Sequence, residues 1–179
     1  FVALLPKSTD DWRDTGIVDF NTFDFSRIAV SNATGVIDLQ FDITNKLWTL
    51  PRSAARADAT RMADSLRGLF MTRVSQFVVD GTNTDLETFG LQPPALEIVF
   101  TLGTNVTEAY QFGKTVPTNT ALCYARRPLW NSVFTVPSAA LAPWQSADQD
   151  FRDRQLLAVK RPVNEIEFHG AENFTVRRA

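Results

Sequence analysis

The chain has little of the residue types from which most catalytic, metal and redox sites are built. Its 179 residues include one cysteine, Cys123, and one histidine, His169. A single cysteine excludes an internal disulfide, and the apolar neighbours of Cys123 favour a buried structural thiol. A zinc site at His169 would need further nitrogen or sulfur ligands, and the sequence around it has none. We therefore expect no metal site and no bound cofactor.

Long apolar runs and an excess of positive charge are also missing. No stretch approaches the roughly 18 consecutive apolar residues that a membrane-spanning helix requires. The formal net charge is −2, so the chain has no overall positive field and we expect no nucleic-acid partner. The opening residues 1–6 could be the tail of a longer hydrophobic segment. We expect contact with a membrane only through such an N-terminal anchor outside this chain.

What the chain has in quantity is apolar and aromatic residues, 44% and 11% of the total. A globular chain of this length can bury roughly 70% of its unfolded surface around one core. One long amphipathic helix is predicted over residues 57–70, because Met62, Leu66, Leu69 and Phe70 fall on one stripe. That stripe must be buried against another layer, and the partner that the sequence offers is a sheet.

Alternating apolar and polar residues predict this sheet. The clearest example is Ile37, Leu39, Phe41 and Ile43 with polar residues between them, the pattern of a strand with one buried face. Further strands are predicted at residues 25–30, 47–50, 73–79, 96–102, 108–112, 121–126, 132–136, 163–168 and 174–177. Turns rather than helices separate most of them, which favours antiparallel pairing. The predicted fold class is α+β, a mostly antiparallel sheet with the 57–70 helix on one face.

Two short capped helices complete the predicted fold. Thr84 and Glu87 have the spacing of a capping box, and Ser146 and Gln149 form a second one. The first helix should end almost at once, because a glycine and two prolines follow. The second should run through Leu157.

Three segments are predicted: an irregular N-terminal arm at 1–24, an α+β domain at 25–160 and a C-terminal hairpin at 161–179. The arm should be anchored by aromatic residues, which are Trp12, Phe20 and Phe23. The hairpin is similar in sequence to the first hairpin of the domain. Apolar residues occupy four matching positions in both hairpins, separated by a constant number of residues along the chain: Ile28, Val30, Ala33 and Val36 in the first, and Ile166, Phe168, Ala171 and Phe174 in the second. It could be the start of a second repeat, although two β-hairpins could also share four such positions by chance.

Short motifs along the chain occur in an order that resembles a bacterial family. They are Lys46–Pro51, Ala57–Asp58, Phe89–Pro93, Phe112–Lys114, Tyr124–Arg126, Val133–Val136 and Phe151–Arg154. In this order they resemble the domain of unknown function family 4340, over nearly all of residues 25–178.

This resemblance implies a location and a kind of role. Domains of that family are often in tandem behind an N-terminal membrane anchor, and related sequences accompany the auxiliary subunits of gliding-motility ABC transporters. The resemblance therefore implies a periplasmic or other extracytoplasmic location in the bacterial cell envelope and a non-enzymatic role. It implies no catalytic residue that could be transferred to this chain.

The recurring motif residues also have structural explanations that do not depend on the family. Trp48 should be a core residue at the junction of strand and helix, Asp58 an N-cap and Gly90 a C-cap. Arg126 or Arg152 should be a surface partner of an acidic group.

Three classes of function remain. The first is a non-enzymatic binding or scaffold module of a cell-envelope protein, such as an auxiliary component of an ABC transporter, with other protein domains or subunits as partners. The second is a carbohydrate-binding module in which Trp12, Trp130 and Trp144 supply stacking platforms. The third is an uncharacterised hydrolase that uses His169 or a carboxylate pair. No nucleophile elbow, phosphate loop or dinucleotide fingerprint supports the hydrolase, so no catalytic residue is assigned.

An acidic run at Asp148, Asp150 and Asp153 could suggest a cation site. It lacks the glycine and the distal glutamate of a calcium loop. It also lies at a predicted helix start, where the helix dipole favours acidic residues. We therefore expect a structural role and no metal there.

Overall fold

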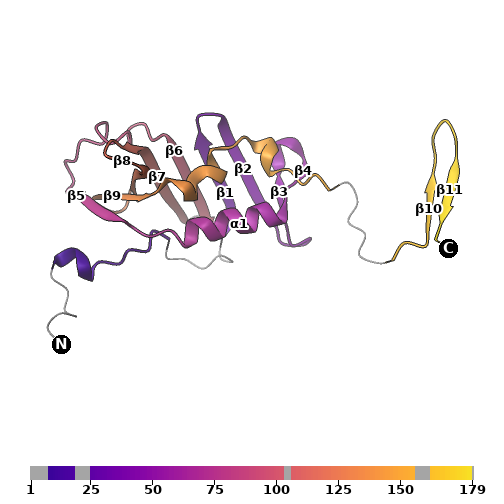
Figure 1. Ribbon diagram of the computed structural model, residues 1–179, viewed down its shortest axis with the longest axis horizontal. Coiled ribbons are helices and arrows are strands. Elements are labelled where there is room, and N and C mark those ends of the chain that lie inside the picture. Colours follow the sequence, from indigo (N-terminus) through magenta and orange to yellow (C-terminus); the bar gives the residue numbers. More distant parts are fainter. Residues whose placement is uncertain (1–7, 19–24, 103–105, 156–161, 179) are drawn as a thin grey trace.

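The body of the protein is one antiparallel sheet of nine strands, in the order β4-β3-β2-β1-β6-β7-β8-β9-β5 (Figure 1). The computed structural model describes residues 8–18, 25–102, 106–155 and 162–178. The strands of the sheet are β1 (Phe25–Asn32), β2 (Gly35–Asp42), β3 (Leu47–Leu50), β4 (Ala55–Arg56), β5 (Gln76–Asp80), β6 (Leu96–Leu102), β7 (Val106–Val116), β8 (Asn119–Arg126) and β9 (Ser132–Pro137). The predicted antiparallel sheet with one main helix is confirmed.

The helix α1 (Ala59–Phe70) crosses one face of this sheet. It joins β4 at one edge to β5 at the opposite edge, so it has to span the strands between them (Figure 1). The helix begins two residues later than predicted, because Asp58 is the N-cap. One carboxylate oxygen of Asp58 accepts hydrogen bonds from the backbone amides of Thr60 at 2.9 Å and Arg61 at 3.0 Å. The expected role of Asp58 is thereby confirmed.

Two 3₁₀ helices return across the same face of the sheet. They are η4 (Ser138–Gln145) and η5 (Asp148–Phe151). They end beside β4, where the amide of Asp58 donates to the carbonyl of Phe151 at 2.8 Å. Leu141, Trp144 and Phe151 are buried in the same core as the α1 residues Met62 and Leu69. The core therefore lies between the sheet and a layer made of α1, η4 and η5.

The first predicted capped helix is wrong. Residues 84 and 85 are irregular, Leu86 is a bend and residues 87–90 form turns, so no helix starts at Thr84. A short 3₁₀ segment, η3 (Pro51–Ser53), lies elsewhere in the chain, before β4. The hydroxyl of Thr84 donates to the carbonyl of Gly81 at 3.0 Å and so caps nothing. Asp85 satisfies the local amides instead, since its carboxylate accepts from the amide of Glu87 at 3.1 Å. An Asx turn of this kind competes with helix formation.

The second capped helix is also wrong in its residues and its length. The helix that forms, η5, has four residues and is capped by Asp150, whose carboxylate accepts from the amide of Ala147 at 3.2 Å. Ser146 instead donates its hydroxyl to the carbonyl of Pro143 at 2.6 Å. The helix cannot continue beyond Phe151, because the next residue, Arg152, forms a β-bridge with Ala57. Residues 156 and 157 lie outside the described part of the chain.

The described part of the N-terminal arm is not anchored by Trp12, one of the three aromatic residues predicted to hold it. This part, 8–18, contains a 3₁₀ turn, η2 (Thr9–Trp12), in which Trp12 is 76% exposed. The anchor is Ile17, which is buried in the core, together with a hydrogen bond from the amide of Val74 to the carbonyl of Thr15 at 2.8 Å. Phe20 and Phe23 lie outside the described residues.

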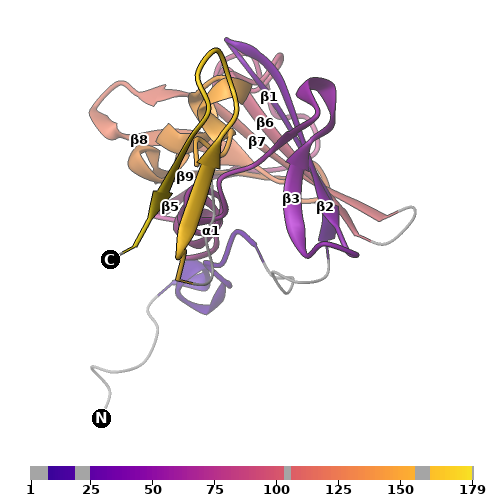
Figure 2. The ribbon, with the colours of Figure 1, turned by 90° about the vertical axis from the view of Figure 1, so that its right-hand side faces the viewer.

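A second, two-stranded sheet follows the body. It is the hairpin of β10 (Glu165–Phe168) and β11 (Phe174–Arg177). Figure 1 shows the hairpin as a separate projection beyond the β4 edge, and Figure 2, seen from that side, places it in front of the body. Every described residue of 162–178 is exposed. The hairpin is therefore outside the core.

Substitution of Leu66 should reveal which face of α1 is buried. Leu66 is 9% exposed and belongs to the core, whereas the side chain of the next residue, Arg67, is 71% exposed. We expect Leu66→Ala to reduce the free energy of unfolding by about 2 kcal/mol, a value at the low end for buried leucines because one side of Leu66 faces a groove. Arg67→Ala should cost much less. Equal denaturation midpoints for the two variants would contradict the assigned face.

Candidate functional site

An apolar groove runs between α1 and the ends of strands β1, β2 and β3. Its volume is about 670 Å³. The floor is an aromatic cluster in which the ring centroid of Trp48 lies 5.6 Å from that of Phe25 and 5.4 Å from that of Phe41. Phe70 adds a ring 6.3 Å from Phe25. Trp48 is partly buried against the core, as expected for the junction of strand and helix. We call this site the α1 groove.

The rim of the α1 groove carries positive charge. Lys46, in the turn between β2 and β3, and Arg67, on α1, both line it. The guanidinium of Arg67 pairs with Asp64 at 2.9 Å, one turn away on the same helix. None of the described lining residues is acidic.

The hairpin β10–β11 presents a second apolar surface. Its four apolar side chains, each exposed, are Ile166, Phe168, Phe174 and Val176. The cross-strand pairs are Ile166 with Val176 and Phe168 with Phe174, so all four lie on one face. The rings of Phe168 and Phe174 stack with centroids 4.4 Å apart. We call this surface the hairpin face.

The sequence match between the two hairpins needs a correction at the turn. In the first hairpin, Val30 pairs with Ile37, and Val36 is exposed. In the second hairpin, Phe168 pairs with Phe174. The structural counterpart of Phe174 is therefore Ile37, and the match to Val36 at a constant offset is wrong. The turn of the second hairpin is one residue shorter.

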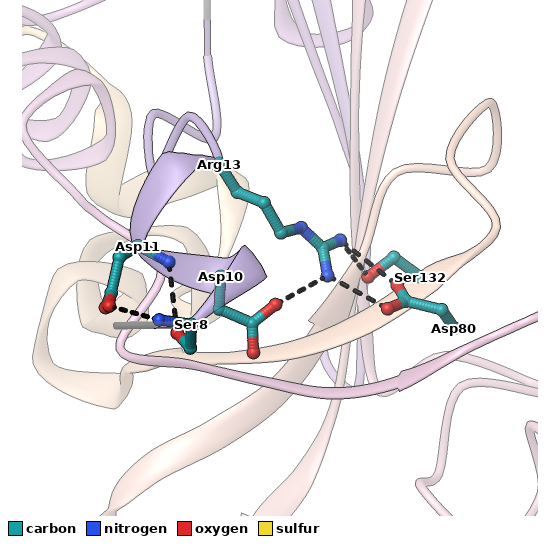
Figure 3. A network of polar contacts seen from close by, with 6 residues as sticks. All are labelled: Ser8, Asp10, Asp11, Arg13, Asp80 and Ser132. Atoms are coloured by element: carbon teal, nitrogen blue, oxygen red, sulfur yellow. Dashed lines mark hydrogen bonds and ion pairs between the residues drawn. The ribbon is translucent and has the colours of Figure 1, made fainter. Parts of the chain in front are cut away.

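An ionic network ties the N-terminal arm to the far edge of the sheet (Figure 3). The guanidinium of Arg13 donates to the carboxylate of Asp80 at 2.9 Å and 3.1 Å, and to the hydroxyl of Ser132 at 3.0 Å. It also pairs with Asp10 at 3.3 Å and lies 3.5 Å from the ring centroid of Phe77. The hydrogen bond from Arg13, and then that from Ser132, lower the pKa of Asp80. This network holds the arm against the edge of the sheet.

Loss of this network should release the arm. We expect Asp80→Asn to increase hydrogen exchange at the amides of residues 9–16 several-fold, with Asp64→Asn as a control for a carboxylate paired elsewhere. Because the pKa of Asp80 is lower in the folded state, its contribution is present above the ordinary aspartate pKa and is lost as pH falls through the lowered value. After correction for the intrinsic exchange rate at each pH, acidification of the unchanged protein should therefore lower the protection of these amides as Asp80→Asn does. Unchanged exchange in the variant would show that Ile17 alone holds the arm.

The residues considered for catalysis are far from one another. His169 lies in the exposed turn of the hairpin, where its Nε2 is 3.3 Å from a carboxylate oxygen of Glu167. Cys123 is buried in β8, its thiol donates weakly to the carbonyl of Val136 at 3.8 Å, and burial raises its pKa to about 11. A thiol with this pKa is protonated at neutral pH and unreactive. The predicted structural role of Cys123 agrees with this burial.

The acidic run has structural partners. Asp150 caps η5, and Asp153 pairs with Arg56 at 2.8 Å. Within the described residues, no group of three or more histidine, cysteine, aspartate or glutamate side chains could hold a metal ion. The same part of the chain contains no helix long and apolar enough to cross a membrane.

The three tryptophans do not form an exposed row. Trp144 is fully buried beside Phe151, with ring centroids 5.8 Å apart. Trp130 is partly buried, and the guanidinium of Arg127 lies 4.4 Å from the centroid of its ring. Trp12 alone is exposed. The carbohydrate-binding alternative therefore lacks the coplanar platforms on which it depended.

The remaining motif residues have local roles. Gly90 has a left-handed backbone, with φ of 68°, and its amide closes a turn by donating to the carbonyl of Glu87 at 2.9 Å. It therefore ends a turn and does not cap a helix. The ion pair expected of Arg126 is made by the next residue, Arg127, with Glu108 at 2.8 Å. The interaction of Arg152 that the structure shows is made by its backbone, which forms a β-bridge with Ala57.

Comparison with known families assigns the chain to one of them. The profile of the domain of unknown function DUF4340 matches residues 48–179. This match covers well over half of the chain, so the protein belongs to the DUF4340 family. No curated protein and no solved structure matches the sequence significantly.

Proposed function

We propose that this chain is a non-enzymatic binding or scaffold module of a bacterial cell-envelope protein, in the manner of an auxiliary component of an ABC transporter. Its partners are other protein domains or subunits of an envelope complex. The observation that carries this proposal is the hairpin face. Four apolar side chains on an exposed two-stranded hairpin form a surface that another folded unit would cover.

The first hairpin of the same chain supports this interpretation. In β1 and β2, the corresponding pairs are Ile28 with Leu39 and Val30 with Ile37, and all four side chains are buried under the layer of α1, η4 and η5. This similarity supports the division that we propose: an arm at 1–24, an α+β domain at 25–160, and a C-terminal hairpin at 161–179 that corresponds to the opening hairpin of a second repeat.

The non-enzymatic role is supported by the separation of the reactive groups. His169 is on the hairpin and Cys123 is in the core, so they cannot act together in one site. The proposed envelope location and the proposed membrane anchor both rest on the family resemblance.

Site-specific photo-crosslinking in the source bacterium tests this proposal. A photoreactive residue is placed at Phe168 or Val176 on the hairpin face and, as a control, at Thr175 on the opposite face of the same strand. We expect crosslinks from the hairpin face to a further domain of the same protein or to another envelope protein, and few from Thr175. Equal crosslinking from both faces, or crosslinks to cytoplasmic proteins alone, would overturn it. Measured turnover abolished by His169→Ala would overturn the non-enzymatic part.

A further inference from the structure

We propose that the α1 groove binds the alkyl chain of a single-chain anionic amphiphile, of which a free fatty acid is the simplest. This inference does not depend on the proposed function, because the groove and the hairpin face are made by different residues. The proposal rests on three features of the groove: its depth, its apolar lining and the charge at its rim.

The depth of the groove favours a slender occupant. A volume of about 670 Å³ lies within the range of roughly 300–1,000 Å³ typical of small-molecule sites. Yet three of its lining residues are almost fully buried, with Met62 1%, Phe25 3% and Leu66 9% exposed. Among its large apolar lining residues only Phe41 and Met71 are exposed, so the groove offers little apolar surface to a second protein. A partner helix, about 10–12 Å across with its side chains, needs a wide trough of exposed residues. A stable protein interface also needs roughly 800 Å² from each partner.

The lining suits an alkyl chain. Along α1, the small residues Ala59 and Ala63 line the groove and leave space for an occupant. Met71, just after the end of the helix, is the last residue that lines it. The distance from Ala59 to Met71 along the helix is roughly 18 Å at 1.5 Å per residue, which suits a linear occupant. Aromatic rings and methionine side chains on the remaining walls are apolar and adaptable.

The rim supplies a place for an anionic headgroup. Lys46 makes no ion pair with any described residue. The nearest acidic residue of its turn, Asp42, is turned back to the side-chain amide of Asn45 at 2.6 Å, and this hydrogen bond lowers its pKa. Lysine and arginine can cover apolar surface with their stems and keep the charge at the water interface. Lys46 therefore places positive charge at the rim of the apolar groove, whereas the charge of Arg67 is already paired with Asp64.

Fluorescence titration of the full chain with cis-parinaric acid tests the site. We expect saturable binding that monomeric palmitate displaces. Ala63→Trp should fill the groove and weaken binding about tenfold or more, which corresponds to at least roughly 1.4 kcal/mol. Because Ala63 is exposed, this variant should keep its fold, which circular dichroism verifies. Ala139→Trp, at an exposed alanine of η4, should leave the affinity unchanged.

A second pair of variants tests the headgroup. Lys46→Glu should weaken displacement by palmitate several-fold and leave displacement by neutral hexadecanol unchanged. Lys114→Glu, at an exposed lysine outside the groove, should affect neither. Equal losses for palmitate and hexadecanol would overturn the anionic part of the proposal.

Other occupants are distinguished in the same experiment. Binding to phosphatidylglycerol vesicles that Ala63→Trp abolishes would support the site with a membrane lipid as the source of the chain. Vesicle binding that Ala63→Trp leaves intact, without binding of palmitate, would overturn the proposal. So would absence of saturable binding, or binding of an acidic amphipathic peptide in place of palmitate.

Discussion

Replacement of Trp144 by alanine should reduce the free energy of unfolding by about 3–5 kcal/mol. Its side chain is fully buried between η5 and the rest of the core, with its ring 5.8 Å from that of Phe151. Its backbone carbonyl also accepts a hydrogen bond from the side-chain amide of Asn32 at 2.8 Å, which fixes η4 on β1. Loss of the indole would leave a large cavity at the point where the returning segment is attached to the sheet.

Chemical denaturation of Trp144→Ala and Trp12→Ala measures this effect against a matched control. Trp12 is 76% exposed, so its removal should change the free energy of unfolding little. The loss in free energy of unfolding for Trp144→Phe should lie between the losses for these two variants, because phenylalanine keeps an aromatic ring in the core. A stable Trp144→Ala variant that had lost affinity for a glycan would contradict the buried position and restore the carbohydrate-binding alternative.

Gly113→Ala should destabilise the fold by about 3 kcal/mol or more. A Cβ atom at Gly113 would overlap sterically with the carbonyl oxygen of Phe89 and would lie 3.0 Å from the backbone of Gly90. These obstacles are backbone atoms, which cannot move aside as a flexible side chain can. The turn at 84–90 is attached there, because the amide of Lys114 donates to the carbonyl of Phe89 at 3.1 Å. The added methyl group would push that turn away from β7.

Gly68→Ala is the matched control for this substitution. Gly68 lies in α1, and no heavy atom is within 4 Å of the position that its Cβ would take. Alanine is the better helix former, so the variant should gain about 0.5–1 kcal/mol. Thermal unfolding should therefore shift in opposite directions for the two glycines. A neutral Gly113→Ala variant would show that the turn is not packed against β7 as described.

The parts of the fold that were predictable are those with local periodicity. The stripe of Met62, Leu66 and Leu69 predicts the helix, and alternation predicts β1, β2, β6 and the strands that follow. Asp58 was identified as a cap because the cap is a local hydrogen bond. The capped helices at Thr84 and Ser146 failed for a related reason. Asp85 took the amide of Glu87 that Thr84 was expected to cap, and Asp150 bound the amide of Ala147, which shifted the second helix start by one residue.

The candidate sites were not predictable, because they are made by tertiary contacts. Arg13 and Asp80 are separated by 67 residues and meet only because the arm lies along the β5 edge. The α1 groove exists because α1 connects opposite edges of the sheet and leaves a space beside the ends of β1, β2 and β3. No residue of the groove is unusual in sequence. Its apolar residues look like any core residues until their positions are known.

The hairpin face was partly predictable. Alternation identified both hairpins and suggested their similarity, but the turn that shifts Phe174 into the place of Ile37 could not be seen without the strand register. Burial is the second difference. The sequence does not reveal that Ile28 and Val30 are buried in the core, whereas Ile166 and Phe168 remain 46% and 44% exposed.

Hydrogen exchange in the two hairpins tests most directly the central claim, which is that the hairpin face is a contact surface for another folded unit. An isolated two-stranded hairpin is marginally stable in water, whereas strands in a core open only with the whole domain. We expect the amide exchange rates of Ile166 and Phe168 to be roughly a thousandfold or more higher than those of their counterparts Ile28 and Val30. Equal protection of the two hairpins in the monomeric chain would contradict it, because the second hairpin would then be packed into the domain that precedes it.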